Sequence, residues 1–368
     1  MKVLHFILGK ANKDRANGVN QVIAGLAKYC TRQGAEVRVI GKAESVACQG
    51  ELIQRDGFTV EAYSGWGPPL RSALAEGIKW ADIVHLHGMY SPWNLLVARI
   101  CKKYGRPYVI TLHDGLAPER ARSRGQFKKK VFHAVLQRRH LARAAGVHVL
   151  TEEEATDLFS VAQPRSVFCI PNGIDLEDYP LLEKRDNASA AVINIGYLGR
   201  LSAEKNLEAL CLAFLKVNSA GNMRLKLAGP TSAYGDELLH RYAGKGIELV
   251  GPKFGADKFD FIRSMDLFVH PSSCDVFSIS AMEVLAVGTP LVITRTSNAS
   301  YFYDRGAFFM CEPTTFGLER GLRMAFKRQA DWQAMASKGR LLIEELFNWQ
   351  TAANDILEAY NSILAENS

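Results

Sequence analysis

Short apolar runs typical of buried β-strands alternate with helical patterns through the first half of the chain. Residues 3–8 form the first such run, and apolar side chains then recur at helical spacing from Val19 to Ala27. Further strands are predicted at 36–40, 83–86, 108–112, 147–150 and 167–170. Helical windows lie between most of them, notably at 93–103 and across 120–143. This alternation predicts a parallel sheet with helices on both faces.

The pattern stops at residues 176–190, a polar stretch with mixed charges and Pro180, which we interpret as an interdomain linker. It then restarts. Strands are predicted at 192–198, 225–227, 247–250, 267–269 and 290–293, and helices at 204–217, 257–264 and 280–287. The chain closes on helices, from Phe316 onward and again over 349–365. The sequence therefore predicts an α/β protein of two tandem Rossmann-like, doubly wound domains, with ligands expected at the carboxyl ends of the strands.

Length and composition agree with two folded domains. The chain has 368 residues, 48% hydrophobic and 23% charged, and no apolar stretch approaches the roughly 18 residues of a membrane-spanning helix. The apolar run at 3–8 is too short and wrongly flanked for a signal peptide. Seven cysteines are scattered without a Cys-x-x-Cys pair or a histidine cluster along the sequence, so we expect neither disulfides nor zinc. A cytoplasmic protein is expected.

The positive net charge of +7 comes from one segment. Nine basic residues and no acid lie between 120 and 143, and without them the rest of the chain would carry −2. They are Arg120, Arg122, Arg124, Lys128, Lys129, Lys130, Arg138, Arg139 and Arg143.

Two acids eight positions apart, Asp275 and Glu283, are the strongest candidates for binding chemistry. Asp275 follows the strand at 267–269, and a helix begins near 278–280. Backbone amides of Phe277, Ser278 and Ile279 at that helix start favour an anion, while the carboxylates can hold sugar or ribose hydroxyls. The alternative is a capping box, in which Ser280 and Glu283 only tie down the helix start.

Two cations, Arg200 and Lys205, stand between a strand and a helix, where they can neutralise a diphosphate. The alternative is a solvated helix start. Gly18 opens the first long helix after Asn17, a residue that tolerates positive φ, so close approach to a phosphate is possible there. His113 ends the strand at 108–112.

The spacing of Asp275 and Glu283, followed by Ala-Val-Gly-Thr-Pro-Leu-Val, resembles the retaining GT-B glycosyltransferases of the group-4 family. Four more segments resemble that family in the expected order. They are 84–87 with 110–114, 171–175, 199–207, and 347–349 followed by a final helix. The resemblance implies an N-terminal acceptor-side domain at 1–175, a linker at 176–190 and a nucleotide-sugar domain at 191–346. Residues 347–368 would form a helix that returns to the first domain.

The resemblance also implies roles for the candidate residues. Glu283 would hold the ribose, Arg200, Lys205 and Gly18 the diphosphate, and Asp275 and His113 the donor sugar. Asp275 stands where the family commonly has Glu, and Ser278 where Gly is usual. His85, His87 and His270 are interpreted as structural. The chain has no Asp-x-Asp triplet to hold a divalent ion, so we predict metal-independent transfer with no cofactor.

The basic segment allows three interpretations. An apolar stripe of Phe127, Val131, Phe132, Val135 and Leu136 makes it a basic amphipathic helix, which favours contact with an anionic membrane. Lys128, Lys129, Lys130, Arg138 and Arg139 would make that contact. The alternatives are an ordinary helix packed on the sheet, and nucleic-acid binding, which lacks an accompanying aromatic platform or module.

Together these features predict a retaining glycosyltransferase that uses a UDP-sugar in preference to a GDP-sugar. The expected acceptor is a hydroxyl of a glycan or polyprenyl-linked glycan of a surface polysaccharide or lipopolysaccharide, reached from the inner face of the cell membrane. Two alternatives remain: a nucleotide-sugar epimerase of the same architecture, and a non-catalytic nucleotide-sugar-binding protein. A dehydrogenase is disfavoured because no Gly-x-Gly-x-x-Gly follows the first strand of either domain.

Overall fold

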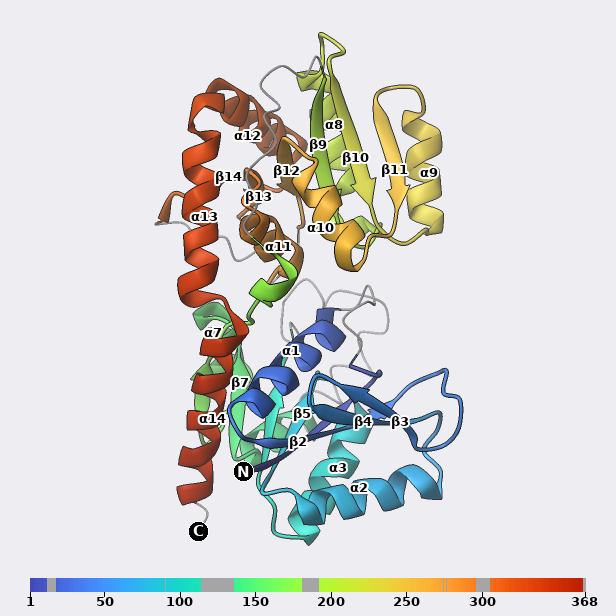
Figure 1. Ribbon diagram of the computed structural model, residues 1–368, viewed down its shortest axis with the longest axis vertical. Coiled ribbons are helices and arrows are strands. Elements are labelled where there is room, and N and C mark those ends of the chain that lie inside the picture. Colours follow the sequence, from blue (N-terminus) through green and yellow to red (C-terminus); the bar gives the residue numbers. More distant parts are fainter. Residues whose placement is uncertain are drawn as a thin grey trace. The chain divides into compact units, whose positions relative to one another are not determined.

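The computed structural model describes residues 1–11, 18–89, 91–113, 136–180, 192–273, 275, 277–295 and 305–366. The chain divides into two compact units (Figure 1). Unit 1 comprises Met1–Gly173 and Trp349–Ser368, and unit 2 comprises Ile174–Asn348. Unit 1 is therefore built from both ends of the chain.

Unit 1 contains an eight-stranded sheet in the order β3-β4-β2-β1-β5-β6-β7-β8. All neighbouring strands are parallel except the antiparallel pair β3 and β4. The strands are β1 (Lys2–Ile7), β2 (Glu36–Lys42), β3 (Glu51–Arg55), β4 (Phe58–Tyr63), β5 (Ile83–His87), β6 (Tyr108–Thr111), β7 (Gly146–Val149) and β8 (Val167–Cys169). The helices among its described residues are α1 (Gly18–Arg32), α2 (Pro68–Trp80), α3 (Pro92–Lys103), α6 (Arg138–Arg143), α7 (Glu152–Val161) and α14 (Trp349–Glu366).

Unit 2 contains a six-stranded, fully parallel sheet in the order β11-β10-β9-β12-β13-β14, which is the strand order of a dinucleotide-binding Rossmann fold. The strands are β9 (Ile193–Leu198), β10 (Met223–Ala228), β11 (Ile247–Gly251), β12 (Leu267–His270), β13 (Leu291–Thr294) and β14 (Phe309–Cys311). The helices are α8 (Leu207–Val217), α9 (Ala233–Tyr242), α10 (Gly255–Arg263), α11 (Ile279–Val287), α12 (Thr315–Lys327) and α13 (Trp332–Leu346). The described part of unit 2 also contains the 3₁₀ turns η2 (Leu176–Asp178), η3 (Ala203–Lys205) and η5 (Gln329–Asp331).

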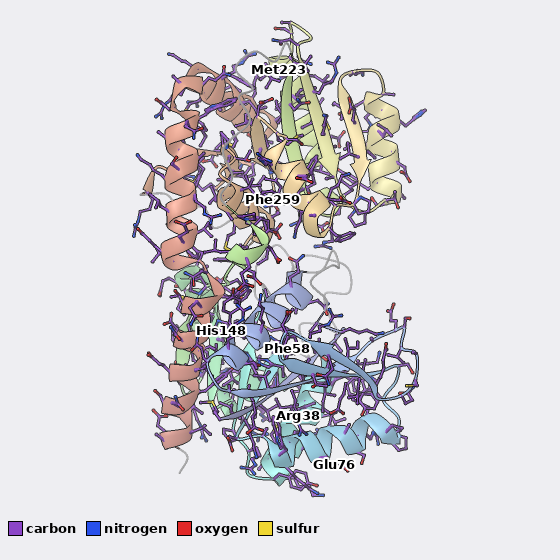
Figure 2. All side chains as sticks on the ribbon, viewed as in Figure 1. Arg38, Phe58, Glu76, His148, Met223 and Phe259 are labelled. Atoms are coloured by element: carbon purple, nitrogen blue, oxygen red, sulfur yellow. The ribbon has the colours of Figure 1, made fainter. Side chains whose placement is uncertain are left out.

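The central strands are buried along their whole length because helices cover both faces of each sheet. Every residue of β5, β7, β12 and β13 is buried. Side chains such as Phe58 in unit 1 and Phe259 in unit 2 belong to these two cores (Figure 2). In unit 1 the last helix completes the core: a Cβ on Gly25 of α1 would lie 2.2 Å from the Trp349 indole at the start of α14.

The predicted fold class, two Rossmann-like α/β domains, is confirmed. The β3–β4 hairpin was not predicted; its turn is Asp56-Gly57, and both residues have positive φ. Most of the expected linker, from 181 to 190, lies outside the described residues, as does the expected basic helix up to 135. Among the described helices, none is long and apolar enough to cross a membrane.

Candidate active site

Each sheet has a switch point: two neighbouring strands whose following connections run toward opposite edges of the sheet. Ligands of such sheets bind outside the carboxyl ends of these two strands. In unit 2 these strands are β9 and β12. Lys205 follows β9, while His270 ends β12 and is followed by Asp275. In unit 1 the corresponding strands are β1 and β5. Candidate residues of both units therefore lie where this fold class binds ligands.

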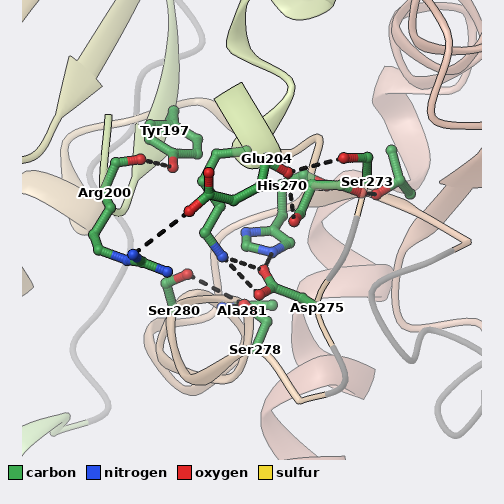
Figure 3. Close-up of polar contacts among 12 residues, drawn as sticks. Tyr197, Arg200, Glu204, His270, Ser273, Asp275, Ser278, Ser280 and Ala281 are labelled. Atoms are coloured by element: carbon green, nitrogen blue, oxygen red, sulfur yellow. Dashed lines mark hydrogen bonds and ion pairs between the residues drawn. The ribbon is translucent and has the colours of Figure 1, made fainter. Parts of the chain in front are cut away.

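Lys205, Asp275 and His270 form a compact charged cluster in unit 2 (Figure 3). The Lys205 Nζ lies 2.6 Å from both Asp275 carboxylate oxygens, and His270 Nε2–H donates to Asp275 Oδ2 at 2.8 Å. The three side chains are only 12%, 10% and 5% exposed, respectively. His270 was interpreted as structural, yet its ring donates to the Asp275 carboxylate and orients it.

The Asp275 carboxylate stays ionised in this cluster. Burial alone would raise its pKa, but the hydrogen bond from His270 and the charge of Lys205 outweigh burial and hold the pKa of Asp275 well below its ordinary value. Both oxygens are engaged by these partners, so the carboxylate is suited to orienting a ligand and poorly suited to nucleophilic attack.

The turn that carries Lys205 is held by hydrogen bonds to its carbonyl groups. The Tyr197 hydroxyl donates to the Arg200 carbonyl at 2.8 Å, and the Ser232 hydroxyl donates to the Leu201 carbonyl at 2.7 Å. The Ser273 hydroxyl donates to the Glu204 carbonyl at 3.0 Å. The turn can therefore present its side chains with little local motion.

Asn206 fixes the end of this turn. Its backbone is left-handed, with φ of 56°, where Asn is better tolerated than most residues. Its Nδ2 donates to the carbonyls of Pro271 and Pro313 at 3.1 and 3.0 Å. One side chain thus ties the Lys205 turn to the segment after β12, which explains why Lys205 and Asp275 meet.

A backbone contact between two glycines sets the course of the chain before Arg200. A Cβ on Gly229 would lie 2.0 Å from the Gly199 carbonyl oxygen. Unit 1 repeats the arrangement, because a Cβ on Gly41 would lie 2.1 Å from the Gly9 carbonyl oxygen. In both units the turn after the first strand packs against the neighbouring strand's end at a distance that only glycine allows.

Arg200 and Lys205 are not equivalent cations. The Arg200 side chain is 56% exposed, and its Nη1 lies 3.5 Å from Oε1 of Glu204, which is 47% exposed. Its guanidinium end points toward the first turn of α11, where Ser280 lies (Figure 3). Lys205 is buried against Asp275. Arg200 is thus free to turn to a ligand, whereas Lys205 can add only a further hydrogen bond.

The start of α11 differs from the capping box that the sequence suggested. Ser278 is the N-cap, its Oγ accepting from the Ala281 amide at 3.2 Å, so the interpretation of Ser280 and Glu283 as a capping box is wrong. Phe277 is buried, with its ring 6.0 Å from that of Phe347, and Ile279 is half-buried. Phe277 can therefore serve a ligand through its backbone only.

Glu283 is enclosed by residues that sequence analysis did not find. Its Oε1 lies 2.6 Å from Lys258 Nζ, and its side chain is 6% exposed. The Tyr179 hydroxyl hydrogen-bonds to Glu283, and burial raises the pKa of Tyr179 well above its ordinary value, so the phenol remains a donor. Arg340 holds this tyrosine in place, donating to the carbonyls of Tyr179 and Ala286 at 2.6 Å.

In unit 1, Gly18 is exposed and is the first residue of α1, whereas Asn17 lies outside the described residues. His113 is half-buried just after β6, in a left-handed conformation with φ of 49°. Such a backbone is strained for a residue other than glycine and is often retained at functional sites.

The fold gathers histidines that are far apart in the sequence, which corrects the expectation that the chain lacks a histidine cluster. They are His5 on β1, His85 and His87 on β5, His113 after β6, and His148 on β7, the last labelled in Figure 2. Burial lowers the pKa of His5 and His113 to about 3 and that of His148 to about 4. The cluster is neutral at physiological pH.

The basic residues proposed for membrane contact are only partly described. Arg138 and Arg139 are exposed on α6, which has six residues. Lys128, Lys129 and Lys130 lie outside the described residues.

Two Rossmann-like units, with a cation–carboxylate cluster at the switch point of the second, define a protein of GT-B architecture. A family model described as Glycosyltransferase Family 4 matches residues 16–178, and one described as Glycosyl transferases group 1 matches residues 193–317. The chain belongs to the group-4 family of GT-B glycosyltransferases.

Relatives and solved structures agree with this assignment. The GDP-mannose:cellobiosyl-diphosphopolyprenol alpha-mannosyltransferase of Xanthomonas campestris is 26% identical over 303 residues, or 78% of this chain and 77% of that protein. The D-inositol 3-phosphate glycosyltransferase of Stackebrandtia nassauensis is 21% identical over 402 residues, or 95% and 87%. The fold is similar to sucrose-phosphate synthase from Thermosynechococcus elongatus (TM-score 0.83, 17% identity, 100% of both chains). It is also similar to Anabaena HepE in complex with UDP and glucose (TM-score 0.78, 19% identity, 98% and 100%).

Proposed function

We propose that this glycosyltransferase moves a sugar from a nucleoside-diphosphate donor to an acceptor hydroxyl with retention of anomeric configuration and without a metal ion. The observation that carries the proposal is the Lys205–Asp275–His270 cluster at the switch point of unit 2. A UDP-sugar is favoured over a GDP-sugar, although among the similar proteins one is named for GDP-mannose and another was solved with UDP.

Breaking the anomeric C–O bond leaves its electron pair on the diphosphate, so that group must be stabilised as it departs. Arg200, exposed and directed toward the start of α11, is proposed to turn from Glu204 to the diphosphate. Lys205 has a third N–H beyond its two contacts with Asp275, and the free amides of α11 add further donors. Fixed cations and amides thus take the part that a divalent ion takes in other transferases.

The acceptor oxygen forms the new bond to the anomeric carbon, and its proton is proposed to pass to the departing phosphate oxygen. Asp275 orients a sugar hydroxyl, because its carboxylate is already held by Lys205 and His270. His113 of unit 1 is proposed to contact the donor sugar, and Gly18 the diphosphate. Glu283 is proposed to hold the ribose, with Lys258 and Tyr179 setting the orientation of its carboxylate.

Thermal unfolding with UDP-, GDP- and ADP-sugars in EDTA tests this assignment. Donors with one of the three nucleotide bases should raise the melting temperature more than the others. This increase should vanish in Lys205→Met and in Glu283→Gln, each compared with its own melting temperature without donor. Lys216→Met, which removes an exposed cation of unit 2, is the matched control and should keep the increase. Equal stabilisation by every donor, or full stabilisation of both variants, would contradict the site.

Turnover distinguishes the remaining alternatives. A transferase consumes donor faster when a glycan acceptor is added, and its product keeps the anomeric configuration, which NMR reads directly. Epimerised donor formed without acceptor would instead identify an epimerase, and binding without any turnover would identify a non-catalytic protein.

We also propose that the acceptor is lipid-linked and that the basic segment contacts an anionic membrane. Arg138 and Arg139 are exposed, as this contact requires. Changing both to Glu should weaken cosedimentation with anionic vesicles, whereas Lys102→Glu/Lys103→Glu, at the exposed end of α3, is the matched control. Equal binding of the two double variants would contradict the membrane contact.

A further inference from the structure

Three histidines form a hydrogen-bonded chain that ends at the candidate catalytic residue of unit 1. His5 Nδ1 lies 2.9 Å from His87 Nε2, and His87 Nδ1 lies 3.0 Å from His113 Nε2. The rings come from β1, β5 and the end of β6, which are adjacent strands of the sheet. Contact between them is therefore fixed by the strand order.

The state of one ring in this chain determines the state of the next. Burial lowers the pKa of His5, His87 and His113 far below the physiological range, so each ring is neutral and carries one N–H. A neutral imidazole donates through one nitrogen and accepts through the other. Only two arrangements of protons satisfy both hydrogen bonds, and they run in opposite directions.

The buried end of the chain selects the direction. His5 Nε2 is buried and has no hydrogen-bond partner among the residues that the structure describes. Buried N–H groups without a partner are rarer in proteins than buried acceptors without one. The proton of His5 therefore belongs on Nδ1, where it is donated to His87 Nε2. His87 then donates from Nδ1, and the proton of His113 must lie on Nδ1.

We infer that His87, supported by His5, is a positioning residue that holds His113 as the Nδ1–H tautomer. The inference deepens the proposed function, because it rests on the role of His113 at the donor sugar. His113 Nδ1–H has no partner among the described residues and is thus available to donate to an oxygen of the sugar. A histidine in the other tautomer would offer a lone pair at that place.

A second histidine chain runs beside the first and provides an internal control. The Ile170 carbonyl can only accept, so His148 donates to it from Nε2 at 2.7 Å and accepts from Thr111 at Nδ1. Thr111 in turn accepts from His85 Nε2 at 2.6 Å, and the Tyr360 hydroxyl donates to His85 Nδ1. No hydrogen bond between described residues links this chain to the first, although the His85 and His87 rings stack at 4.2 Å.

Metal binding is the competing explanation for the cluster, since ring nitrogens of His5, His85 and His87 lie within 4.8 Å of one another. The hydrogen bonds argue against it. Both nitrogens of His85 and of His87 are already paired, which leaves only His5 Nε2. A metal ion would have to break several of these bonds.

The test uses ¹⁵N-histidine-labelled full-length protein, in which long-range ¹⁵N–¹H spectra distinguish protonated from unprotonated ring nitrogens. His87→Asn places an amide N–H at the position of Nδ1 and should keep His113 protonated on Nδ1. His87→Asp, which places a carboxylate oxygen at that position, replaces the donor by an acceptor and should shift His113 toward the Nε2–H tautomer. His148→Gln, in the second chain, should leave the His113 signals unchanged.

Donor turnover gives an independent reading. His87→Asp should lower kcat roughly tenfold, the value of about one hydrogen bond, with the KM for the donor unchanged, and His87→Asn should keep most of the activity. An unchanged His113 tautomer in His87→Asp would overturn the inference, as would stoichiometric zinc in the purified protein. Full activity of His113→Ala would instead overturn the proposed role of His113 and leave the tautomer result standing.

Discussion

At the scale of single residues, the pairing of Lys205 with Asp275 makes a prediction about stability. Removing one member of a buried ion pair leaves the other charge unpaired, so Lys205→Met should lower the free energy of unfolding by roughly 3 kcal/mol. The double variant Lys205→Met/Asp275→Leu should recover most of that loss. Urea denaturation measures both. Lys216→Met removes an exposed lysine whose partner Glu319 keeps a second ion pair with Arg323, and it should cost less than about 1 kcal/mol. Equal losses in the two single variants would contradict the buried pair.

The same carboxylate predicts a dependence of stability on acid. The pKa of Asp275 is lower in the folded protein than its ordinary value of 3.8, so its contribution is complete above that value and is lost as the pH falls below it. Wild type should therefore lose stability more steeply below pH 4 than Asp275→Asn does. Urea midpoints measured from pH 5 to pH 3 check this, and parallel slopes would show that Asp275 is not stabilised by its partners.

Functional residues could be predicted where a local motif identifies them, and not where their role depends on contacts between distant parts of the chain. Lys205, Asp275 and Glu283 were found because short motifs place them at a strand end or a helix start. His270 and Lys258 were missed as functional residues, because their importance depends on contacts to Asp275 and Glu283 across the fold. The histidine chain was missed for the same reason: His5 and His87 are 82 positions apart.

At the scale of elements, the two glycine contacts predict matched effects. In Gly229→Ala the new Cβ would lie 2.0 Å from the Gly199 carbonyl oxygen. In Gly41→Ala it would lie 2.1 Å from the Gly9 carbonyl oxygen. Backbone atoms cannot turn aside as a side chain does, so each should cost about 1–3 kcal/mol of unfolding free energy by urea denaturation. Gly65→Ala, where a Cβ meets nothing within 4 Å, is the control and should be nearly neutral.

The elements themselves were predictable where burial makes a continuous apolar run. Both sheets were expected because strands such as β6 in unit 1 and β13 in unit 2 are mainly such runs. The β3–β4 hairpin lies at the sheet edge, where β3 is only half-buried and its apolar pattern is weak. Its signal was the Asp56-Gly57 dipeptide, a preferred two-residue hairpin turn, which periodicity alone does not detect.

At the scale of the whole molecule, the last helix belongs to the unit that holds the start of the chain. Helix α14 contributes Trp349, Ile356 and Tyr360 to the core of unit 1, and all three are buried. The chain enters unit 2 at Ile174 and leaves it after Asn348. These two segments are hydrogen-bonded to each other, since the Ile174 N–H donates to the Phe347 carbonyl at 2.8 Å. Unit 1 thus cannot complete its core until α14 has been made.

The Tyr360 hydroxyl tests this dependence, because it is the polar contact that fixes α14 to β5. Burial raises the pKa of Tyr360 well above its ordinary value, so the hydroxyl keeps its proton and donates to His85. Tyr360→Phe leaves the His85 acceptor unpaired and should cost about 1–2 kcal/mol. In hydrogen exchange, peptides covering β5 and β7 should lose protection while those covering β10 keep it.

Tyr197→Phe is the reciprocal control, since the Tyr197 hydroxyl donates to the Arg200 carbonyl within unit 2. It should loosen peptides covering the 199–206 turn and leave those of β5 and β7 unchanged. Loss of protection confined to the unit that carries each substitution would show that the two units unfold separately, with α14 part of the first. Equal loss across both units in either variant would show instead that the chain unfolds as one cooperative body.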